Sequence, residues 1–266
     1  MAVSCDAIQV YRDLETLSGA ATPAERRHLE HRLVGFVEPT GEFSAGRFAA
    51  LAHEEIDQLL GDGRRPIVVG GTGLYLRAAL ADLDLRPPVP PEIRAEVERE
   101  VTDRGPEAVW ADLDPDVAAT IHPRDRKRIA RTTELQRAGV GPLRSSEGLW
   151  TARLRHPTLL VGLTIDRSDL ADRIDSRVDE MIAAGAAEEA SAVAEQGASR
   201  TARAALGFEE LIAGDVEAVK QAHRAYSRRQ LTWMRKMEGV KLIDRTGRED
   251  RDVAEEIVVS LGENGA

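Results

Sequence analysis

Pro66-Ile67-Val68-Val69-Gly70-Gly71-Thr72-Gly73-Leu74-Tyr75 is the stretch that decides the fold of this chain of 266 residues. Its first four residues are short and rich in β-branched side chains, which predicts a buried strand. The glycine-rich turn then opens a helix that we expect to run to about Leu83. Strand, glycine turn and helix are the repeating unit of a parallel α/β sheet. The turn either serves geometry alone or brings backbone N–H groups to a ligand, and these residues leave both readings open.

A carboxylate follows another predicted strand at the start of the chain. Met1-Ala2-Val3 is typical of the tail of a strand, and Asp6 and Gln9 come shortly after it. Ligands of open α/β sheets bind at the carboxyl ends of the strands. Asp6 is therefore a candidate base that takes a proton from a substrate, with Gln9 as a candidate reader of a hydrogen-bonding edge. The plainer alternative is an aspartate that caps a turn or a helix.

The chain is predicted to divide into an α/β core and a helical insertion. Four prolines between Arg86 and Pro91 form a stiff, extended connector. Beyond it, helices are expected over 92–104 and about 115–138, without strands between them. We assign residues 1–86 and 148–266 to the core and residues 87–147 to the insertion. The stretch Ser145-Ser146-Glu147-Gly148 is typical of a return linker.

The remainder of the core is expected to contain long helices and two further strands. We expect strands over 159–165 and 240–243, and helices over 45–61, 168–196 and 216–238. The helix over 168–196 should be capped by Ser168 or Asp169 and end at Gly197. Its aspartates recur at helical spacing and indicate a solvated face, with Arg173 and Arg177 as their expected ion-pair partners.

The amino-acid composition is that of a globular protein without a membrane span or an internal disulfide. Hydrophobic residues make up 42% and charged residues 31% of the chain, as in globular proteins. No stretch approaches the roughly 20 apolar residues of a membrane span, and no secretory signal is evident. The single cysteine, Cys5, excludes an internal disulfide and fits a buried thiol beside a strand. We therefore expect a cytoplasmic protein with no membrane partner.

Two basic segments contrast with a net charge of −10. Residues 124–137 carry six basic and two acidic side chains, and Lys127, Arg128 and Arg131 would share one side of a helix. Such a face suits gripping the phosphates of a nucleic acid, or it is simply solvated. Arg224 and Arg228 also share a helix face, where arginines can fork onto a pyrophosphate, or belong to an ordinary amphipathic helix.

Several common catalytic motifs are missing from the sequence. It has no G-x-x-x-x-G-K-[ST] phosphate loop, no H-E-x-x-H metal motif and no G-x-S-x-G nucleophile motif. The sequence therefore leaves the residues that would bind a metal unknown.

Taken in order, the motifs resemble those of the tRNA dimethylallyltransferases, also called tRNA isopentenyltransferases. The resemblance covers nearly the whole chain. It rests on S-x-D-x-x-Q-V-Y at 4–11, F-S-A at 43–45, G-G-T-G-L-Y at 70–75, P-E-I-R at 91–94, I-H-P-x-D-x-x-R-I-x-R at 121–131, D-R-x-x-L-x-x-R-I-x-x-R-V-D-x-M at 166–181, L-G-F-x-E at 206–210 and R-R-Q-L-T-W at 228–233. Each motif is weak alone, and the ordered set is specific.

The resemblance implies a nucleotide-binding, P-loop-kinase-like parallel sheet core with a helical insertion. It also implies transfer of a dimethylallyl group from dimethylallyl diphosphate, with Mg²⁺, to the N6 amine of the adenine on the 3′ side of the anticodon. We expect the enzyme to act as a monomer on the anticodon stem-loop. A carboxylate that accepts the amine proton and cations that receive the diphosphate suit this chemistry, and the adenine must leave its stack.

The same resemblance implies roles for matching positions. Asp6 and Thr72 would be catalytic, with Asp6 as the base and Thr72 at the reaction channel. Arg224 and Arg228 would bind the diphosphate. The residues implied to contact tRNA are Asp6, Ala7, Ile8, Gln9, Thr72, Arg94, Lys127, Arg128, Ile129, Ala130 and Arg131. Ala7 replaces the serine usual in the family, and Lys127 replaces a frequent glutamine.

The family's phosphate loop normally precedes the S-x-D motif by about one βα unit. The sequence begins within what should be the second strand, so we expect the first strand, the P-loop and its helix to be absent. Two hypotheses follow: an enzyme read from an upstream start, or an N-terminally truncated, inactive tRNA-binding remnant. A small-molecule kinase of the same fold is a third reading, which phosphorylation of a small acceptor without tRNA binding would favour.

Overall fold

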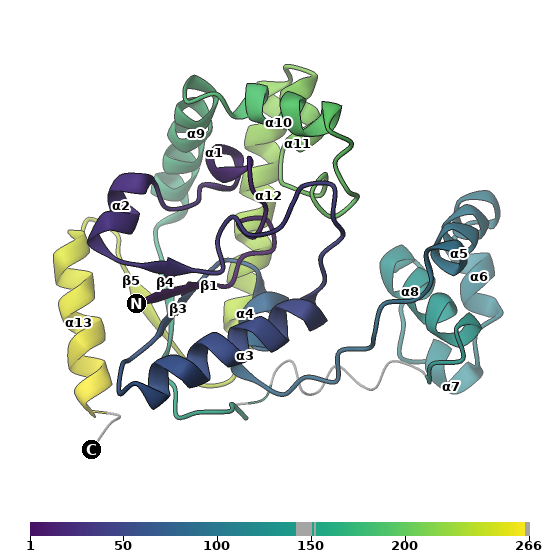
Figure 1. Cartoon of the computed structure of the whole chain (residues 1–266), viewed down its shortest axis with the longest axis horizontal. Coiled ribbons are helices and arrows are strands. Elements are labelled where there is room, and N and C mark those ends of the chain that lie inside the picture. The colour runs from purple at the N-terminus through teal and green to yellow at the C-terminus, as the bar shows by residue number, and fades with distance from the viewer. Residues whose placement is uncertain (142–150, 152, 264–266) are drawn as a thin grey trace. The chain divides into compact units, whose positions relative to one another are not determined.

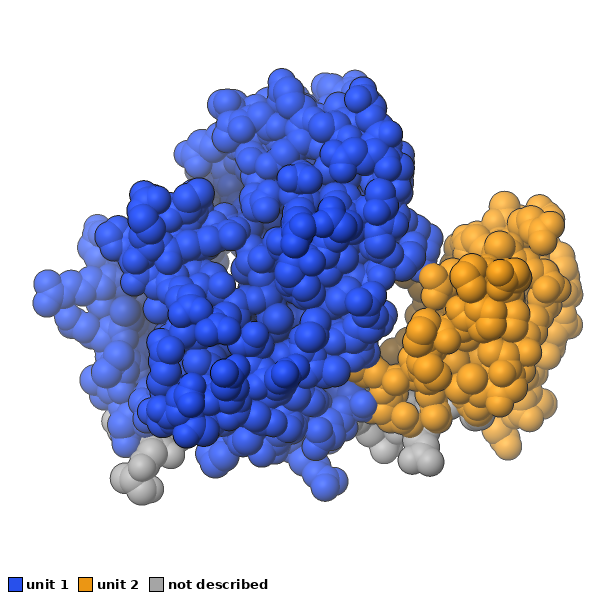
Figure 2. All heavy atoms as spheres, in the orientation of Figure 1, with its two compact units in different colours: residues 1–83, 149–266 blue, residues 84–148 orange. Residues whose placement is uncertain are grey.

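The computed structural model describes residues 1–141, 151 and 153–263. It contains two compact units, residues 1–83 with 149–266 and residues 84–148 (Figures 1 and 2). The expected return linker, Ser145 to Gly148, lies outside the described residues.

Parallel strands form the centre of the first unit. β1 (Ala2–Ser4) lies between β2 (His31–Arg32) and β3 (Ile67–Val69), and Ala2 is opposite both His31 and Ile67. β4 (Leu160–Thr164) pairs with β5 (Val240–Asp244) in a second sheet. The predicted α/β class with parallel strands is confirmed.

The strand expected over residues 66–69 is confirmed as β3, which begins at Ile67, but the expectation that it is buried is wrong. Ile67 and Val69 are each 54% exposed. Among the described strands β3 pairs only with β1, so it is an edge strand of its sheet. An apolar strand is buried only when other elements cover its faces and pair with its edges. The sequence of the strand alone does not show which elements do so.

Helices α3 (Ala45–Gly61) and α4 (Gly73–Leu80) pack against each other. Ser44 caps α3 by accepting a hydrogen bond from the Arg47 amide at 3.3 Å. The ring of Phe48 lies on that of Tyr75, with 4.6 Å between ring centres. α3 spans the predicted residues and buries one stripe at helical spacing, formed by Phe48, Ala52, Ile56 and Leu59.

The helix expected over 168–196 is two helices, α9 (Arg167–Ala183) and α10 (Ala186–Glu195). The chain leaves the direction of α9 at Gly185, which has a φ of 95°. The capping residue is Asp166 rather than Ser168 or Asp169, because its carboxylate accepts from the Ser168 amide at 2.8 Å. Gly197 does follow the end of α10, with a φ of 84°.

The predicted ion-pair partners of the α9 aspartates are also wrong. Asp175 pairs with Arg224, and Asp179 pairs with Lys220 at 2.7 Å. Both partners lie on α12 (Val216–Lys236), which packs against α9. The aspartates of α9 therefore form ion pairs with α12. The sequence of α9 predicts only partners on the same helix, whereas a helix packed against it supplies other cations.

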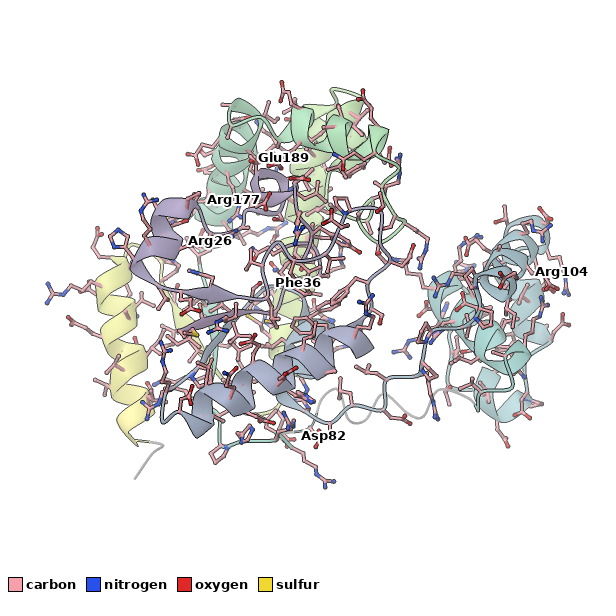
Figure 3. All side chains as sticks on the ribbon, in the orientation of Figure 1. Arg26, Phe36, Asp82, Arg104, Arg177 and Glu189 are labelled. Atoms are coloured by element: carbon pink, nitrogen blue, oxygen red, sulfur yellow. The ribbon has the colours of Figure 1, made fainter. Side chains whose placement is uncertain are left out.

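The first unit also contains the described helices α1 (Glu15–Ser18), α2 (Pro23–His28), α11 (Phe208–Ile212) and α13 (Asp250–Glu263). Glu189 of α10 holds the start of α1 (Figure 3). Its two carboxylate oxygens accept from the amides of Thr16 and Leu17, each at 2.9 Å. This contact fixes the segment that follows β1 against α10.

The second unit is helical, as expected, with α5 (Pro91–Arg104), α6 (Pro106–Ala111), α7 (Pro115–Ala118) and α8 (Arg126–Arg137). The single helix expected over 115–138 is wrong. The segment between α7 and α8 turns back, and Trp110 Nε1 donates to the carbonyls of Ala118 at 3.1 Å and Ile121 at 2.8 Å. The core of the unit contains Val97, Val101, Val109, Leu113, Ala118, Ile121, Ile129 and Ala130.

Candidate functional site

Asp6 lies in the turn that follows β1. The Cys5 amide donates to the carbonyl of Val69 at 2.8 Å, and the chain then leaves the sheet. One carboxylate oxygen of Asp6, Oδ1, accepts from the amides of Ile8 at 2.8 Å and Gln9 at 3.3 Å. This is the turn-capping role that the sequence offered as the plainer alternative. The second oxygen, Oδ2, is left to make a contact outside the turn.

Thr72 provides that contact from the carboxyl end of β3. Its hydroxyl lies 3.2 Å from Asp6 Oδ2, and the amide of Ala7 donates to the same hydroxyl at 3.5 Å. Thr72 is the residue before α4, yet its hydroxyl makes no capping bond to that helix. Because the carboxyl ends of parallel strands meet at one edge of a sheet, the fold brings together two residues that lie 66 positions apart in the chain.

Helix α12 closes one side of this pair. Tyr226 donates its hydroxyl hydrogen to the carbonyl of Gly71 at 2.9 Å, and its oxygen lies 3.3 Å from the hydroxyl of Thr72. Gln230 Nε2 donates to the same carbonyl at 3.1 Å. Trp233 lies one turn further along, so residues at i, i+4 and i+7 of α12 face the turn between β3 and α4.

Helix α12 approaches the glycines of this turn closely. A Cβ atom on Gly71 would lie 2.1 Å from Gln230 Nε2, the end of a flexible side chain that can move aside, whereas one on Gly73 would lie 2.2 Å from the rigid indole of Trp233. Contacts as short as the one at Gly73 do not occur in folded proteins, so the turn needs glycine there for packing. The geometric reading is thus sufficient for Gly73.

Burial, helped by the negative charge of Asp6, raises the pKa values of three neighbouring side chains. Burial raises the pKa of the Cys5 thiol to about 12, and the charge of Asp6 adds to the rise. Burial also raises the pKa of Tyr226, with Asp6 acting in the same direction and the hydrogen bond to Thr72 acting against it. The pKa of Tyr75 is likewise raised by burial, then by Tyr11 and Asp6. Cys5 is a buried free thiol, as predicted.

The other predicted members of the 6–9 segment lie in the same turn. Ala7, Ile8 and Gln9 are half-buried. The amide of the Gln9 side chain is engaged on both sides, because Oε1 accepts from Ser4 Oγ at 2.8 Å and Nε2 donates to the carbonyl of Gly19 at 3.3 Å. Gln9 would have to exchange one of these partners to read a base.

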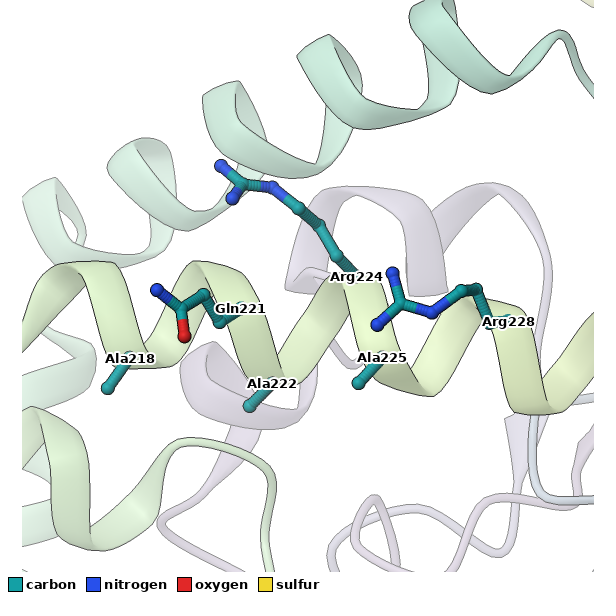
Figure 4. A pocket seen from close by; sticks show the side chains of 6 residues that line it. All are labelled: Ala218, Gln221, Ala222, Arg224, Ala225 and Arg228. Atoms are coloured by element: carbon teal, nitrogen blue, oxygen red, sulfur yellow. The ribbon is translucent and has the colours of Figure 1, made fainter.

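Arg224 and Arg228 come together as predicted, on one face of α12. They line a hollow of about 530 Å³ with Gln221 and three alanines, Ala218, Ala222 and Ala225 (Figure 4). Arg224 reaches toward α9, where its Nε donates to Asp175 at 3.0 Å. That ion pair lowers the pKa of Asp175 and raises the pKa of Arg224. The side chain of Arg228 is exposed.

The second unit carries the remaining predicted residues, and they do not share one exposed face. Lys127 and Arg128 of α8 are exposed, whereas Ile129 and Ala130 lie in the core of the unit. Arg131 is directed to its own unit: it pairs with Glu134 at 3.1 Å and donates to the carbonyls of Arg86 and Pro87.

The expected grouping of Arg131 with Lys127 and Arg128 as one accessible face is therefore wrong, because a carboxylate one turn away and the connector hold Arg131 inward. Arg94 of α5 lies 4.0 Å from the same Glu134. Only Lys127 and Arg128 of these candidate cations are exposed in the described structure.

Neither a metal cluster nor a membrane segment is evident in the parts of the chain that the structure describes. No three His, Cys, Asp or Glu side chains gather there to hold a metal ion. No described helix is both long and apolar enough to cross a bilayer.

Tyr226 and Gln230 are parts of the site that sequence reasoning missed. The segment 223–233 stood out for its cations; Tyr226 lies between Arg224 and Arg228, and Gln230 directly follows Arg229. A signal was present, because Tyr226, Gln230 and Trp233 recur at the spacing of one helix face. That face is the one that α12 turns toward the β3–α4 turn, while Arg224 and Arg228 occupy another.

Comparison with known proteins identifies the family. A family model described as IPP transferase matches residues 9–237. The chain belongs to this family. The match includes Gln9, Thr72, the α8 segment and the α12 arginines, and starts just after Asp6.

Individual members of the IPP transferase family are similar over most of their length. The tRNA dimethylallyltransferase of Parvibaculum lavamentivorans is 39% identical over 88% of this chain and 79% of its own. That of Symbiobacterium thermophilum is 34% identical over 97% of this chain and 86% of its own. The crystal structure of the tRNA isopentenylpyrophosphate transferase of Bacillus halodurans has a TM-score of 0.70 at 28% identity, covering 99% of this chain and 87% of that one. The resemblance drawn from the motifs is confirmed.

Proposed function

We propose that this chain transfers a dimethylallyl group from dimethylallyl diphosphate to the N6 amine of the adenine 3′ of the anticodon in tRNA. Family membership and relatives that are tRNA dimethylallyltransferases support this activity. The observation that carries the assignment of the site is the contact between Asp6 and Thr72, at the carboxyl ends of neighbouring parallel strands.

Asp6 serves as the general base of the reaction. The amine nitrogen attacks the allylic carbon of the donor, a C–N bond forms, and the C–O bond to diphosphate breaks. The amine proton passes to the carboxylate of Asp6, which makes the weakly nucleophilic nitrogen more reactive. Oδ1 is held by the turn, so Oδ2, which contacts Thr72, is the oxygen placed to receive the proton.

Arg224 and Arg228 receive the diphosphate, which gains charge as the C–O bond breaks. Arg228 is exposed, and Arg224 would exchange its bond to Asp175 for phosphate oxygens. We propose that Mg²⁺ enters with the diphosphate, since Mg²⁺ often binds through substrate phosphates, and we assign no chemical step to it.

The exposed cations of α8 hold the RNA backbone. Lys127 and Arg128 lie at the start of the helix, where Asp125 accepts from the Arg128 amide at 3.1 Å and fixes the first turn. Phosphate contacts of this kind position an RNA without reading its sequence. We place this activity in the cytoplasm and assign it to a monomer.

Prenyl transfer by the purified chain tests the proposal. The chain is mixed with dimethylallyl diphosphate, Mg²⁺ and an anticodon stem-loop that carries the target adenine, and the mass of the RNA is followed. We expect a mass gain, and we expect Asp6→Asn to lower turnover by about a hundredfold or more. Asn keeps an oxygen for the turn, so stem-loop affinity should change little.

Asp62→Asn is the matched control, since Asp62 is an exposed carboxylate at the end of α3. It should leave turnover unaltered. Turnover that survives Asp6→Asn would remove Asp6 from the base role. Stem-loop binding without any mass gain would support the tRNA-binding remnant instead.

A further inference from the structure

A chain of three side-chain oxygens runs from Asp6 through Thr72 to Tyr226. Thr72 Oγ1 lies 3.2 Å from Asp6 Oδ2 and 3.3 Å from the hydroxyl of Tyr226, so it is almost equidistant from two acceptors. The three residues come from three parts of the chain: the turn after β1, the turn after β3, and α12. Their contact is a product of the tertiary fold.

The hydrogens of this chain can be counted. A carbonyl oxygen only accepts, so the hydroxyl hydrogen of Tyr226 belongs to its 2.9 Å bond with Gly71. The oxygen of Tyr226 is then free to accept from Thr72. Thr72 itself accepts from the amide of Ala7 and has one hydrogen to give. With Asp6 ionised, that hydrogen goes to the carboxylate, because bonds to an ionised acceptor are the stronger ones.

We infer that Tyr226 is a positioning residue that accepts the hydroxyl hydrogen of Thr72 when Asp6 becomes protonated. This inference rests on the proposed role of Asp6 as the base. The proton leaves the amine and binds Asp6 Oδ2, which then donates to Thr72 Oγ1. Thr72 turns its own hydrogen to the oxygen of Tyr226, and the hydrogen of Tyr226 stays on Gly71. The chain thus holds the one proton that the amine has lost, on Asp6, while Thr72 and Tyr226 each keep their own hydroxyl hydrogen.

Without Tyr226, the hydroxyl of Thr72 has no acceptor once Asp6 carries the proton. An unpaired polar group in a half-buried site is unfavourable, so the protonated form of Asp6 becomes harder to reach. The base is weakened without any change in the residues that touch substrate. Tyr226→Phe removes the acceptor and keeps the ring beneath the guanidinium of Arg229, which lies 5.5 Å from the ring centre.

Kinetics with Tyr226→Phe provide the first test. We expect turnover to fall about tenfold, the acidic limb of the pH–rate profile to move to lower pH, and KM for the stem-loop to stay within about twofold. Tyr11→Phe is the matched control, since the Tyr11 hydroxyl bonds to Thr201 at 2.5 Å in another part of the same unit. Equal turnover and an unchanged pH profile for Tyr226→Phe would overturn the inference.

A double-mutant cycle separates positioning from general damage to the fold. If Tyr226 acts through Thr72, then Tyr226→Phe should have no further effect on turnover once Thr72→Val is present. Effects that simply multiply would show that Tyr226 acts by another route and would overturn the inference.

A third measurement does not require transfer activity, so a failure of the proposed function remains distinguishable. The phenol of Tyr226 is titrated by ¹³Cζ NMR and assigned with Tyr226→Phe. The charged groups that face it are Asp6 from the turn after β1 and Arg229 on α12. Thr72→Val should raise the pKa of Tyr226, and Asp6→Asn should lower it. If neither variant moves the titration, the three oxygens are not coupled and the inference fails.

Discussion

Gly73→Ala tests how tightly α12 is seated on the turn between β3 and α4. A Cβ atom at this position would lie 2.2 Å from Cε3, 2.3 Å from Cδ2 and 2.8 Å from Cζ3 of Trp233. Three ring atoms of one rigid indole would be displaced together, so the whole side chain or the helix must move. Overpacking of this kind costs about 1–3 kcal/mol.

Gly73→Ala also stabilises the chain through the higher helix propensity of alanine, and this gain must be compared with the cost of the clash. Alanine is favoured over glycine in a helix interior by at most about 1 kcal/mol, and Gly73 is only the first residue of α4. The clash therefore outweighs the propensity. We expect a net destabilisation of about 1–2 kcal/mol, which lowers the melting temperature by a few degrees.

Urea unfolding followed by far-ultraviolet circular dichroism measures the change. Gly61→Ala is the matched control, because Gly61 also lies at a helix end and has no heavy atom within 4 Å of the added Cβ. That control should be neutral or slightly stabilising. If Gly73→Ala proved as stable as the parent chain while Gly61→Ala behaved as expected, the packing of Trp233 on the turn would be refuted.

Three further outcomes are expected. Burial raises the pKa of the Cys5 thiol from 9.0 to about 12 in the folded chain, so the unfolded state loses this proton first as the pH rises. The free energy of unfolding should therefore fall above about pH 9, by at most about 1.4 kcal/mol per pH unit. Urea unfolding at about pH 8, 9 and 10 should show this fall, and Cys5→Ala should make the free energy of unfolding less dependent on pH. Trp110→Phe removes the donor shared by two carbonyls and should destabilise the helical unit by about 1–2 kcal/mol in thermal unfolding, whereas an unchanged transition would contradict the role of those bonds. Arg128→Ala should weaken stem-loop binding and reduce the slope of log affinity against log salt concentration by roughly one, while the control Arg251→Ala on α13 should change neither quantity. An unaltered slope would show that Arg128 faces solvent and does not bind RNA phosphates.

The sequence predicts the site unevenly. Asp6 and Thr72 follow strands, and the rule that ligands bind at the carboxyl ends of parallel strands is enough to place both at one sheet edge. Arg224 and Arg228 are paired by helical spacing alone. The role of Tyr226 cannot be predicted in this way, because it depends on which face of α12 contacts the β3–α4 turn. Helical spacing shows which residues share a face, but not which element that face packs against.

Charged residues show the same limit. The cations of the 124–131 run look alike in the sequence, yet Arg131 turns inward to Glu134 and the connector carbonyls while Arg128 is exposed. Spacing matches the α9 aspartates with arginines of their own helix, and two of these aspartates pair with α12 instead. Ion pairs between elements are decided by which surfaces meet, and that information is not local.

The sequence by itself determined the α/β class, the helical character of the insertion, the order of the family motifs and the candidate base. These are properties of local periodicity, of turn residues and of fixed spacing, which act within a few positions along the chain. Only the tertiary structure decided that β3 lies at an edge among the described strands, with exposed valine and isoleucine, that α9 and α10 separate at Gly185, and that Asp6, Thr72 and Tyr226 form one chain of oxygens. Each of these depends on segments far apart in the sequence, whose contact is fixed by packing and by the hydrogen bonds it permits.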